Sequence, residues 1–251
     1  MSNKTSSPDA QRQQMLVIGA VVGIVAVVAI LAIFASSQGG SESSGIDFSS
    51  ESLGEDGVEV VYERTDNGGH IIGSPDAPAT VVAFEDFLCP ACQSWKPEVN
   101  NIMTELVLTG QVRFEYRFLP TQGARSVYAA QLAECAGDLQ DGGFWTAHDE
   151  LFDMFSNSPT MSESDASREL ASRLDINNSD LIECTIDAEQ VDIDQRFATQ
   201  NGIRSTPSVR LRFGDDGPLQ LIAGRTSGGP SVEEIQAELA LGGNNFSLPP
   251  Q

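Results

Sequence analysis

Positive charge is scarce in this 251-residue sequence. Lysine and arginine together number 14 against 36 aspartates and glutamates, which gives a formal net charge of −22, and the lysines are Lys4 and Lys96 alone. Binding to nucleic acid requires clustered basic side chains, and docking on an anionic lipid surface requires them as well. The composition argues against both functions, and we expect no nucleic-acid partner.

Cysteine and histidine are also few, with four and two residues in the whole chain. Cys89 and Cys92 are the only closely spaced cysteines, whereas Cys135 and Cys184 stand apart from them and from each other. A zinc site of this kind needs a second close pair of ligands, and the two histidines do not supply one. We therefore expect no metal site and no cofactor.

Only one long apolar run occurs, at residues 15–35, and it carries no charge. About 20 such residues span a bilayer as one helix. Lys4 and Arg12 precede the run, and the next basic residue is Arg64. The positive-inside rule then places residues 1–14 in the cytoplasm and the chain after the run outside.

A cleaved signal peptide is the alternative interpretation of this run. The run is longer than the roughly 7–15 residues of a typical signal-peptide core, and no clear A-x-A cleavage site follows it. A retained membrane anchor is favoured. In both cases the rest of the protein lies outside the cytoplasm in an oxidising compartment, where disulfides persist.

The remaining chain divides by composition into three parts. Residues 36–57 are dominated by Ser, Gly and Glu and read as a flexible acidic tether, because they cannot bury enough apolar surface to fold. Residues 58–243 are long enough to form one well-buried domain. Residues 244–251 are interpreted as a tail.

Within the domain the hydrophobic pattern indicates an α/β fold. The order β-α-β near its start implies two parallel strands joined by a right-handed crossover. A helical block, expected as an insertion at about 119–203, separates this unit from a late hairpin and a last helix. The expected strands are 58–62, 80–87, 112–118, 208–213 and 219–223, and the expected helices outside the insertion are about 90–108 and 231–241.

The sequence Cys89-Pro90-Ala91-Cys92 lies where the strand 80–87 gives way to a helix. Proline suits the first helical position, so Cys89 should face the unpaired N–H groups and the positive dipole end of that helix. Such a position favours thiolate over thiol. Cys92, one turn later, can close a small disulfide with Cys89. Half of a zinc site and an inert structural disulfide are the alternatives, and the pattern favours redox chemistry.

Four motifs in this order resemble the DsbA family of extracytoplasmic thiol-disulfide oxidoreductases in its membrane-anchored form. The resemblance covers about residues 73–241 and implies a thioredoxin fold with a helical insertion. The motifs are Gly73-Ser74-Pro75-Asp76-Ala77-Pro78, Asp86-Phe87-Leu88-Cys89-Pro90-Ala91-Cys92, Gly143-Phe144-Trp145 with His148-Asp149, and Gly202-Ile203-Arg204-Ser205-Thr206-Pro207.

The resemblance assigns roles to the residues around the cysteines. It implies a cis peptide bond at Pro207 beside the pair, with the backbone of Thr206 open to an extended substrate. Asp86 matches an acidic position common in the family. Ala91 replaces the histidine that some members hold between the cysteines, which removes one source of thiolate stabilisation.

One position departs from the family pattern. Many members carry a buried acidic residue six positions before the first cysteine, where this chain has Ala83. Glu85 lies two residues later on the same strand face. Two interpretations are open: Glu85 replaces the missing acid, or it is a partly exposed residue near the end of the strand.

The function that the resemblance implies is an oxidase that donates the Cys89–Cys92 disulfide to exported proteins with free thiols. Cys92 would be the buried resolving thiol. A quinone-linked membrane partner of the DsbB or VKOR type would reoxidise the pair, and the anchor would hold the domain at the membrane near it. A thiol reductase of the same compartment is the alternative, followed by a non-catalytic substrate-binding module.

Two further features of the insertion carry expectations. Cys135 and Cys184 each fall on an expected helix and are predicted to form a structural disulfide, with a second redox pair as the alternative. His148 falls at helical spacing with Phe144 and Phe152, so we interpret it as a packing residue and not as a catalytic base.

Overall fold

The computed structural model describes Gly54 and residues 58–242. Its strands form one six-stranded sheet in the order β1-β2-β4-β3-β5-β6. Strands β3 and β4 are parallel, and every other neighbouring pair is antiparallel. The strands are β1 (Val61–Arg64), β2 (His70–Gly73), β3 (Ala79–Glu85), β4 (Arg113–Phe118), β5 (Ser208–Phe213) and β6 (Gln220–Leu221).

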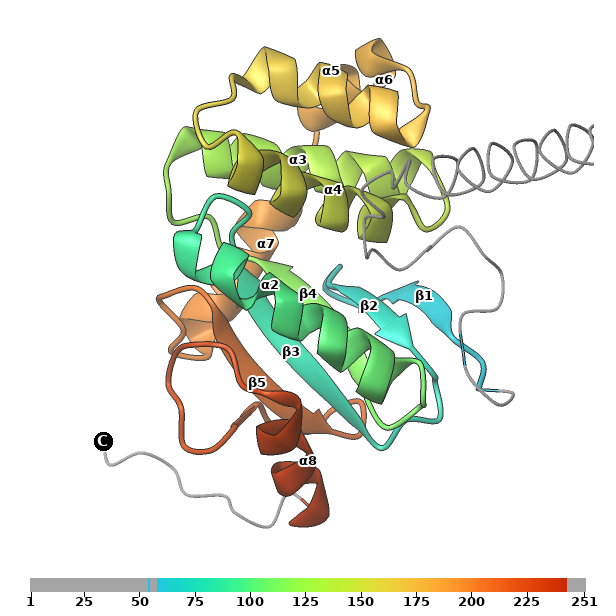
Figure 1. Ribbon diagram of the computed structural model, residues 1–251, viewed down its shortest axis with the longest axis vertical. Helices are drawn as coiled ribbons and strands as arrows, with labels where there is room; N and C mark the ends of the chain where they lie inside the picture. The colour runs from blue at the N-terminus through green and yellow to red at the C-terminus, as the bar shows by residue number, and fades with distance from the viewer. Residues whose placement is uncertain (1–53, 55–57, 243–251) are drawn as a thin grey trace, which may run out of the picture. The chain divides into compact units, whose positions relative to one another are not determined.

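Helices lie on both faces of this sheet and beyond one end of it (Figure 1). Helix α2 runs in front of the strands in that view, while α3 and α4 lie side by side across one end of the sheet, with α5 and α6 beyond them. The helices are α2 (Pro90–Ile102), α3 (Ala124–Leu139), α4 (Gly143–Asn157), α5 (Glu163–Leu174), α6 (Asn178–Thr185), α7 (Gln190–Gln200) and α8 (Val232–Ala240), and a π-helical turn, Met103–Val107, extends α2.

Strand β3 lies in the middle of the sheet and is buried on both faces. Val81 and Ala83 belong to the main core beneath α2, whereas Val82 and Phe84 pack with Ala198 of α7 on the opposite face. A strand that is apolar on both faces reads as a continuous hydrophobic run, which is typical of a sheet covered on both sides. The cysteine pair follows directly from this buried strand.

Buried charges attach α7 to the sheet. Arg117 on β4 donates to Asp194 on α7 at 2.8 Å and to Glu115 at 2.6 Å, and all three side chains are at most 1% exposed. The other carboxylate oxygen of Asp194 accepts from the backbone N–H of Phe118 at 2.8 Å. Removing one member would leave an uncompensated buried charge, which is strongly destabilising.

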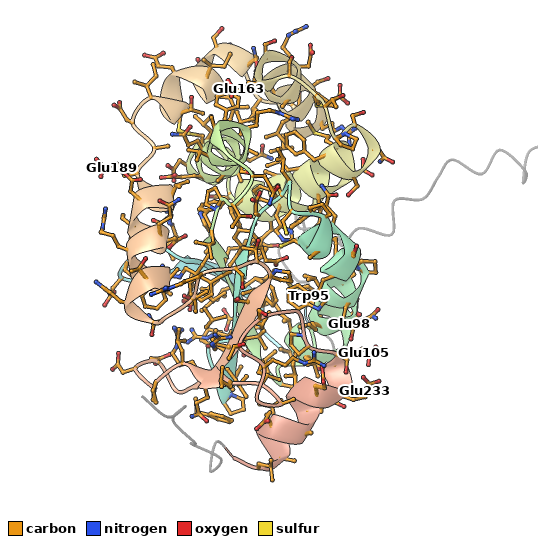
Figure 2. All side chains as sticks on the ribbon, turned by 90° about the vertical axis from the view of Figure 1, so that its left-hand side faces the viewer. Trp95, Glu98, Glu105, Glu163, Glu189 and Glu233 are labelled. Carbon is orange, nitrogen blue, oxygen red and sulfur yellow. A yellow bond between two sulfur atoms is a disulfide. The ribbon has the colours of Figure 1, made fainter. Side chains whose placement is uncertain are left out.

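The C-terminal helix packs against the cysteine-bearing helix. The indole Nε1 of Trp95 donates to the Pro230 carbonyl at 3.0 Å, and Glu98 accepts from the backbone N–H of Val232 at 2.8 Å. Figure 2 shows Trp95 and Glu98 along α2, with Glu233 of α8 nearby. Helix α8 begins with a capping box between Ser231 and Glu234.

The order of elements follows the sequence expectation, with one omission and small shifts of boundaries. The first strand lies at Val61–Arg64 and not at 58–62, and the short strand His70–Gly73 was not among the expected strands. This strand has only four residues, all buried, so it shows no alternation to detect. The helical insertion and the late hairpin occur where they were expected.

None of the helices in the described part of the chain has the length and apolar character needed to cross a bilayer. The apolar run 15–35, the tether 36–57 except Gly54, and the tail 244–251 lie outside the described residues. The predictions of an anchor, a tether and a tail remain predictions.

Candidate active site

Cys89 occupies the N-cap position of α2, and Pro90 is the first helical residue. Its backbone is extended, at φ −74° and ψ 118°, and its carbonyl accepts from the N–H of Gln93 at 3.0 Å. The thiol is therefore held at the end of the helix where backbone N–H groups lack intrahelical partners. Cys89 is 6% exposed and Cys92 is fully buried, and both are free thiols here.

These surroundings lower the pKa of Cys89 to about 5. The largest cause is the hydrogen bond from the Cys92 thiol. Burial opposes it, and further hydrogen bonds from Thr206 and from the backbone N–H groups of Cys92 and Ala91 support it. At pH 7 a pKa of about 5 leaves roughly a hundred thiolates per thiol. Cys89 is thus a nucleophile and a good leaving group at neutral pH.

The same geometry raises the pKa of Cys92 far above its ordinary value. Burial is the largest cause, followed by the hydrogen bond that Cys92 gives to Cys89 and by the negative charge of Glu85. Cys92 must therefore hold a proton whenever it is reduced. The two thiols therefore differ in their chemistry. Cys89 is stable as a thiolate, whereas Cys92 is stable only as the protonated thiol.

The loop before β5 lies against the thiol of Cys89. The peptide bond between Thr206 and Pro207 is cis. In its thiol form Cys89 donates to the Thr206 carbonyl oxygen, which lies 3.5 Å from the sulfur. The Pro207 carbonyl accepts from Gly228 at 2.7 Å, which ties this loop to the segment before α8. The resemblance-based placement of Thr206 and Pro207 beside the pair agrees with this geometry.

Asp86 holds the neighbouring loop in place. One carboxylate oxygen accepts from the backbone N–H of Leu88 at 2.9 Å. The other accepts from Thr121 N–H at 2.6 Å, Thr121 hydroxyl at 2.9 Å, Gln122 N–H at 3.1 Å and Ser126 hydroxyl at 3.0 Å. Asp86 is 3% exposed, so these bonds replace its hydration. It positions the segment that faces Thr206, because Thr121 and Thr206 hydroxyls lie 3.3 Å apart.

Glu85 is the last residue of β3 and is 1% exposed. Neither of its carboxylate oxygens has a hydrogen-bond partner among the described residues. Its pKa is raised to about 8, mainly by burial; Lys96 opposes this shift and Cys89 adds to it. The interpretation of a partly exposed residue is therefore wrong. The carboxyl group is buried close enough to the thiols for their charges to interact.

Lys96, whose charge acts on Glu85, pairs with Asp149, and neither residue was assigned a role in the site from the sequence. Lys96 Nζ lies 2.9 Å from Asp149 Oδ1, and the same oxygen lies 2.9 Å from Nδ1 of His148. Lys96 is on α2 and the other two residues are on α4 of the insertion. The sequence held one hint of this role: Lys96 is the only lysine of the domain and follows Cys92 by one helical turn.

His148 lies in an aromatic cluster, as its helical spacing predicts. Its ring centroid is 5.0 Å from those of Tyr116 and Phe152 and 6.0 Å from that of Phe87. Burial lowers the pKa of His148, opposed by the bond to Asp149, so the ring is neutral at pH 7. Its Nε2 atom has no partner among the described residues.

Cys135 on α3 and Cys184 on α6 form a disulfide with a Cα–Cα distance of 5.8 Å. This bond joins two helices of the insertion and is separate from the pair Cys89 and Cys92. No group of three or more His, Cys, Asp and Glu side chains in the described ranges is arranged to hold a metal ion.

A cavity of about 560 Å³ lies elsewhere, between the β1–β2 hairpin, α7 and the β5–β6 turn, and contains none of the cysteines. Arg113, Arg117 and Arg212 line it, and each lies within 2.8 Å of a carboxylate oxygen. These guanidinium groups are already neutralised by protein carboxylates, so the cavity does not extend the candidate site.

The parallel pair β3–β4, the cysteines at the start of α2 and the loop of Pro207 define a thioredoxin-type protein. The sequence model of the family described as thioredoxin matches residues 65–212, which is more than half of the chain. The chain therefore belongs to the thioredoxin family.

Two curated proteins are similar to parts of this chain. Disulfide bond formation protein D of Bacillus subtilis is 31% identical over 87 residues, covering 34% of this chain and 39% of that protein. The Na⁺/H⁺ antiporter NhaA 1 of Salinispora arenicola is 38% identical over 96 residues, covering 38% of this chain and 14% of the antiporter. The chain thus spans well under half of both curated relatives.

Among solved structures, alpha-DsbA1 of Wolbachia pipientis superposes with a TM-score of 0.59 at 16% identity, covering 69% of this chain and 89% of that one. At this identity the likeness concerns the fold, which is a thioredoxin-like fold with a helical insertion.

Proposed function

We propose that this protein is a thiol-disulfide oxidoreductase of the DsbA type that donates the Cys89–Cys92 disulfide to exported proteins with free thiols. The observation that carries the proposal is the opposite acidity of the two thiols. A pKa of about 5 at Cys89 favours the reduced pair, because each unit of lowering stabilises the thiolate by about 1.4 kcal/mol. A pair that is stable when reduced is a strong oxidant of other thiols.

The reaction proceeds in two exchanges. A substrate thiolate attacks the Cys89 sulfur of the disulfide, a mixed disulfide forms, and Cys92 leaves with the bonding electrons and takes up a proton. A second substrate thiolate attacks the substrate sulfur of this mixed disulfide and releases Cys89 as a thiolate. The substrate loses two electrons and the enzyme pair gains them.

Residues around Cys89 support this sequence of events. The backbone of Thr206 lies beside the sulfur and offers a carbonyl group to an extended substrate segment. Asp86 fixes the loop that meets Thr206, and Pro90 and Ala91 shape the exposed start of α2. The Cys135–Cys184 bond is assigned a structural role within the insertion.

The location and partners belong to the same proposal. Residues 15–35 would anchor the chain, with residues 1–14 in the cytoplasm and the domain outside. A quinone-linked membrane protein of the DsbB or VKOR type would accept the electrons. The similarity to a disulfide bond formation protein supports this setting.

Substitution of each thiol separately tests the mechanism. Cys89→Ser should abolish oxidation of a dithiol peptide, because the attacked sulfur is gone. Cys92→Ser should instead trap a mixed disulfide on Cys89, visible by mass spectrometry. Retained turnover in Cys89→Ser would contradict the proposal, and a reductase would be indicated if the wild-type pair consumed peptide disulfides instead of forming them.

A further inference from the structure

Buried polar atoms without hydrogen-bond partners gather between Cys92 and the helical insertion. Within the described ranges they are both carboxylate oxygens of Glu85, the hydroxyl of Tyr116 and Nε2 of His148. All three side chains are at most 1% exposed. A buried polar group left without a partner costs about 1–3 kcal/mol, so such groups are usually served by buried water or retained for a function.

Strand register and a ring contact place these groups in order. Tyr116 on β4 pairs in register with Ala83 on β3, and Glu85 lies two residues further along the same face. Burial raises the pKa of Tyr116, and the charges of Glu85 and then Cys92 raise it further. The strand register thus places the Tyr116 and Glu85 side chains on the same face of two neighbouring strands. On its other side, the Tyr116 ring meets the His148 ring at 5.0 Å, edge to face.

Asp149, which is bound to His148, connects these buried groups to the surface. His148 binds Asp149 through Nδ1, and the Asp149 side chain is 20% exposed, whereas that of His148 is 1% exposed. A neutral imidazole donates from one ring nitrogen and accepts at the other, so it passes a proton across the ring. Although burial opposes it, the bond to His148 and the charge of Lys96 lower the pKa of Asp149 and keep it ionised.

We propose that Glu85, Tyr116 and His148, bridged by buried water, form a proton path between Cys92 and the surface carboxylate of Asp149. The path rests on the proposed thiol-disulfide function. When Cys92 leaves as the disulfide opens, it receives a proton from Glu85, and Glu85 regains one from solvent along the path. When the pair is reoxidised, the proton of Cys92 leaves in the opposite direction.

Two conservative variants of the full chain test the path. Tyr116→Phe removes one hydroxyl, and His148→Phe removes both ring nitrogens while keeping an aromatic side chain in the cluster. The measured quantity is the rate at which Cys92 displaces glutathione from a Cys89–glutathione disulfide, followed by stopped flow. We expect each variant to be at least fivefold slower at pH 7. The control is Tyr128→Phe, which removes a partly buried hydroxyl on α3.

A packing role for Tyr116 is distinguished by two readouts. The path affects rate alone, so the reduction potential of Tyr116→Phe should equal that of the wild type. The hydroxyl should also matter only through Glu85, so Tyr116→Phe should add no further slowing in a Glu85→Gln background.

The rate should be measured from pH 5 to 9, because several other charges face these groups. Cys89 and Lys96 of α2 act on Glu85, Asp86 acts on Tyr116, and Lys96 and His70 face His148. Tyr116→Phe should slow the reaction most at the pH values where deprotonation of Cys92 limits the rate. The solvent isotope effect on this rate should be smaller in Tyr116→Phe than in the wild type.

Rates of Tyr116→Phe and His148→Phe equal to that of Tyr128→Phe would overturn the path. Multiplying effects of Tyr116→Phe and Glu85→Gln would overturn it as well. Failure of the proposed function gives a different result, since the wild type would then exchange no disulfides with peptides while the glutathione displacement was still measurable.

Discussion

The Nζ atom of Lys96 lies 2.9 Å from Oδ1 of Asp149, and this ion pair joins the helix of the two thiols to the helical insertion. Both side chains are mostly buried, at 14% and 20% exposure. The charge of Lys96 also opposes the rise in the pKa of Glu85. The insertion, through Asp149, therefore binds the lysine whose charge acts on Glu85.

Replacing Lys96 by Met should raise the pKa of Glu85 above about 8, because the positive charge that opposes the shift is lost while burial remains. Infrared difference spectra of the carboxyl band, assigned by Glu85→Gln, would follow this titration. Lys4→Met is the matched control, since it removes the only other lysine. An unchanged titration in Lys96→Met would show that the lysine does not act on Glu85.

Glu85→Gln should change how stability depends on pH. The pKa of this carboxyl rises from 4.5 to about 8 on folding, so its favourable contribution is complete below pH 4.5 and lost as pH rises through 8. Urea unfolding should show equal stability of variant and wild type near pH 4. At pH 9 the variant should be more stable by about 3–5 kcal/mol.

The exposed Glu105 provides the control for this experiment, because Glu105→Gln removes a carboxylate from the surface of the π-helical turn after α2. Its curve of stability against pH should run parallel to that of the wild type. A parallel curve for Glu85→Gln would mean that the carboxylate is solvated in the folded state.

The alkylation rate of Cys89 should reach half its maximum near pH 5 in the reduced protein, because the thiolate is the reactive species. Iodoacetamide labelling across pH 4 to 9, read by mass spectrometry, measures this directly. In Cys92→Ala the midpoint should move upward, since the largest stabilising hydrogen bond is removed. A midpoint near 8.5 in the wild type would match an ordinary cysteine.

Removing the second disulfide should reduce stability without altering the first pair. Cys135 and Cys184 are 49 residues apart, and closing such a loop contributes about 4 kcal/mol in the chain-entropy model. Cys135→Ala with Cys184→Ala should lower the free energy of unfolding by about 2–5 kcal/mol and leave the Cys89–Cys92 potential unchanged. A large loss of turnover with unchanged stability would instead indicate an electron relay.

The local features of the site were predictable from sequence because they depend on neighbouring residues. Pro90 at the start of a helix and Cys92 one turn later fix the geometry of the thiols within a single element. The β-α-β unit follows from the buried run before Cys89. The positions of Thr206 and Pro207 depend on contacts across more than a hundred residues and came from the family resemblance instead.

Tertiary contacts explain what the sequence did not show. Burial of Glu85 depends on the packing of α2 and β4 around the end of β3, and strand periodicity alone left its exposure open. The pairing of Lys96 with Asp149 joins residues 53 positions apart by sequence number. His148 fits the expected packing stripe, yet only the structure shows that one of its nitrogens faces a buried site without a partner.

The reduction potential of the Cys89–Cys92 pair tests the proposed direction of electron flow most directly. Equilibration in glutathione buffers, with the thiols quantified by alkylation, gives this value. We predict a potential near or above about −180 mV, in the range of disulfide donors. A value of about −270 mV or below would contradict the proposal and indicate a protein that reduces its partners.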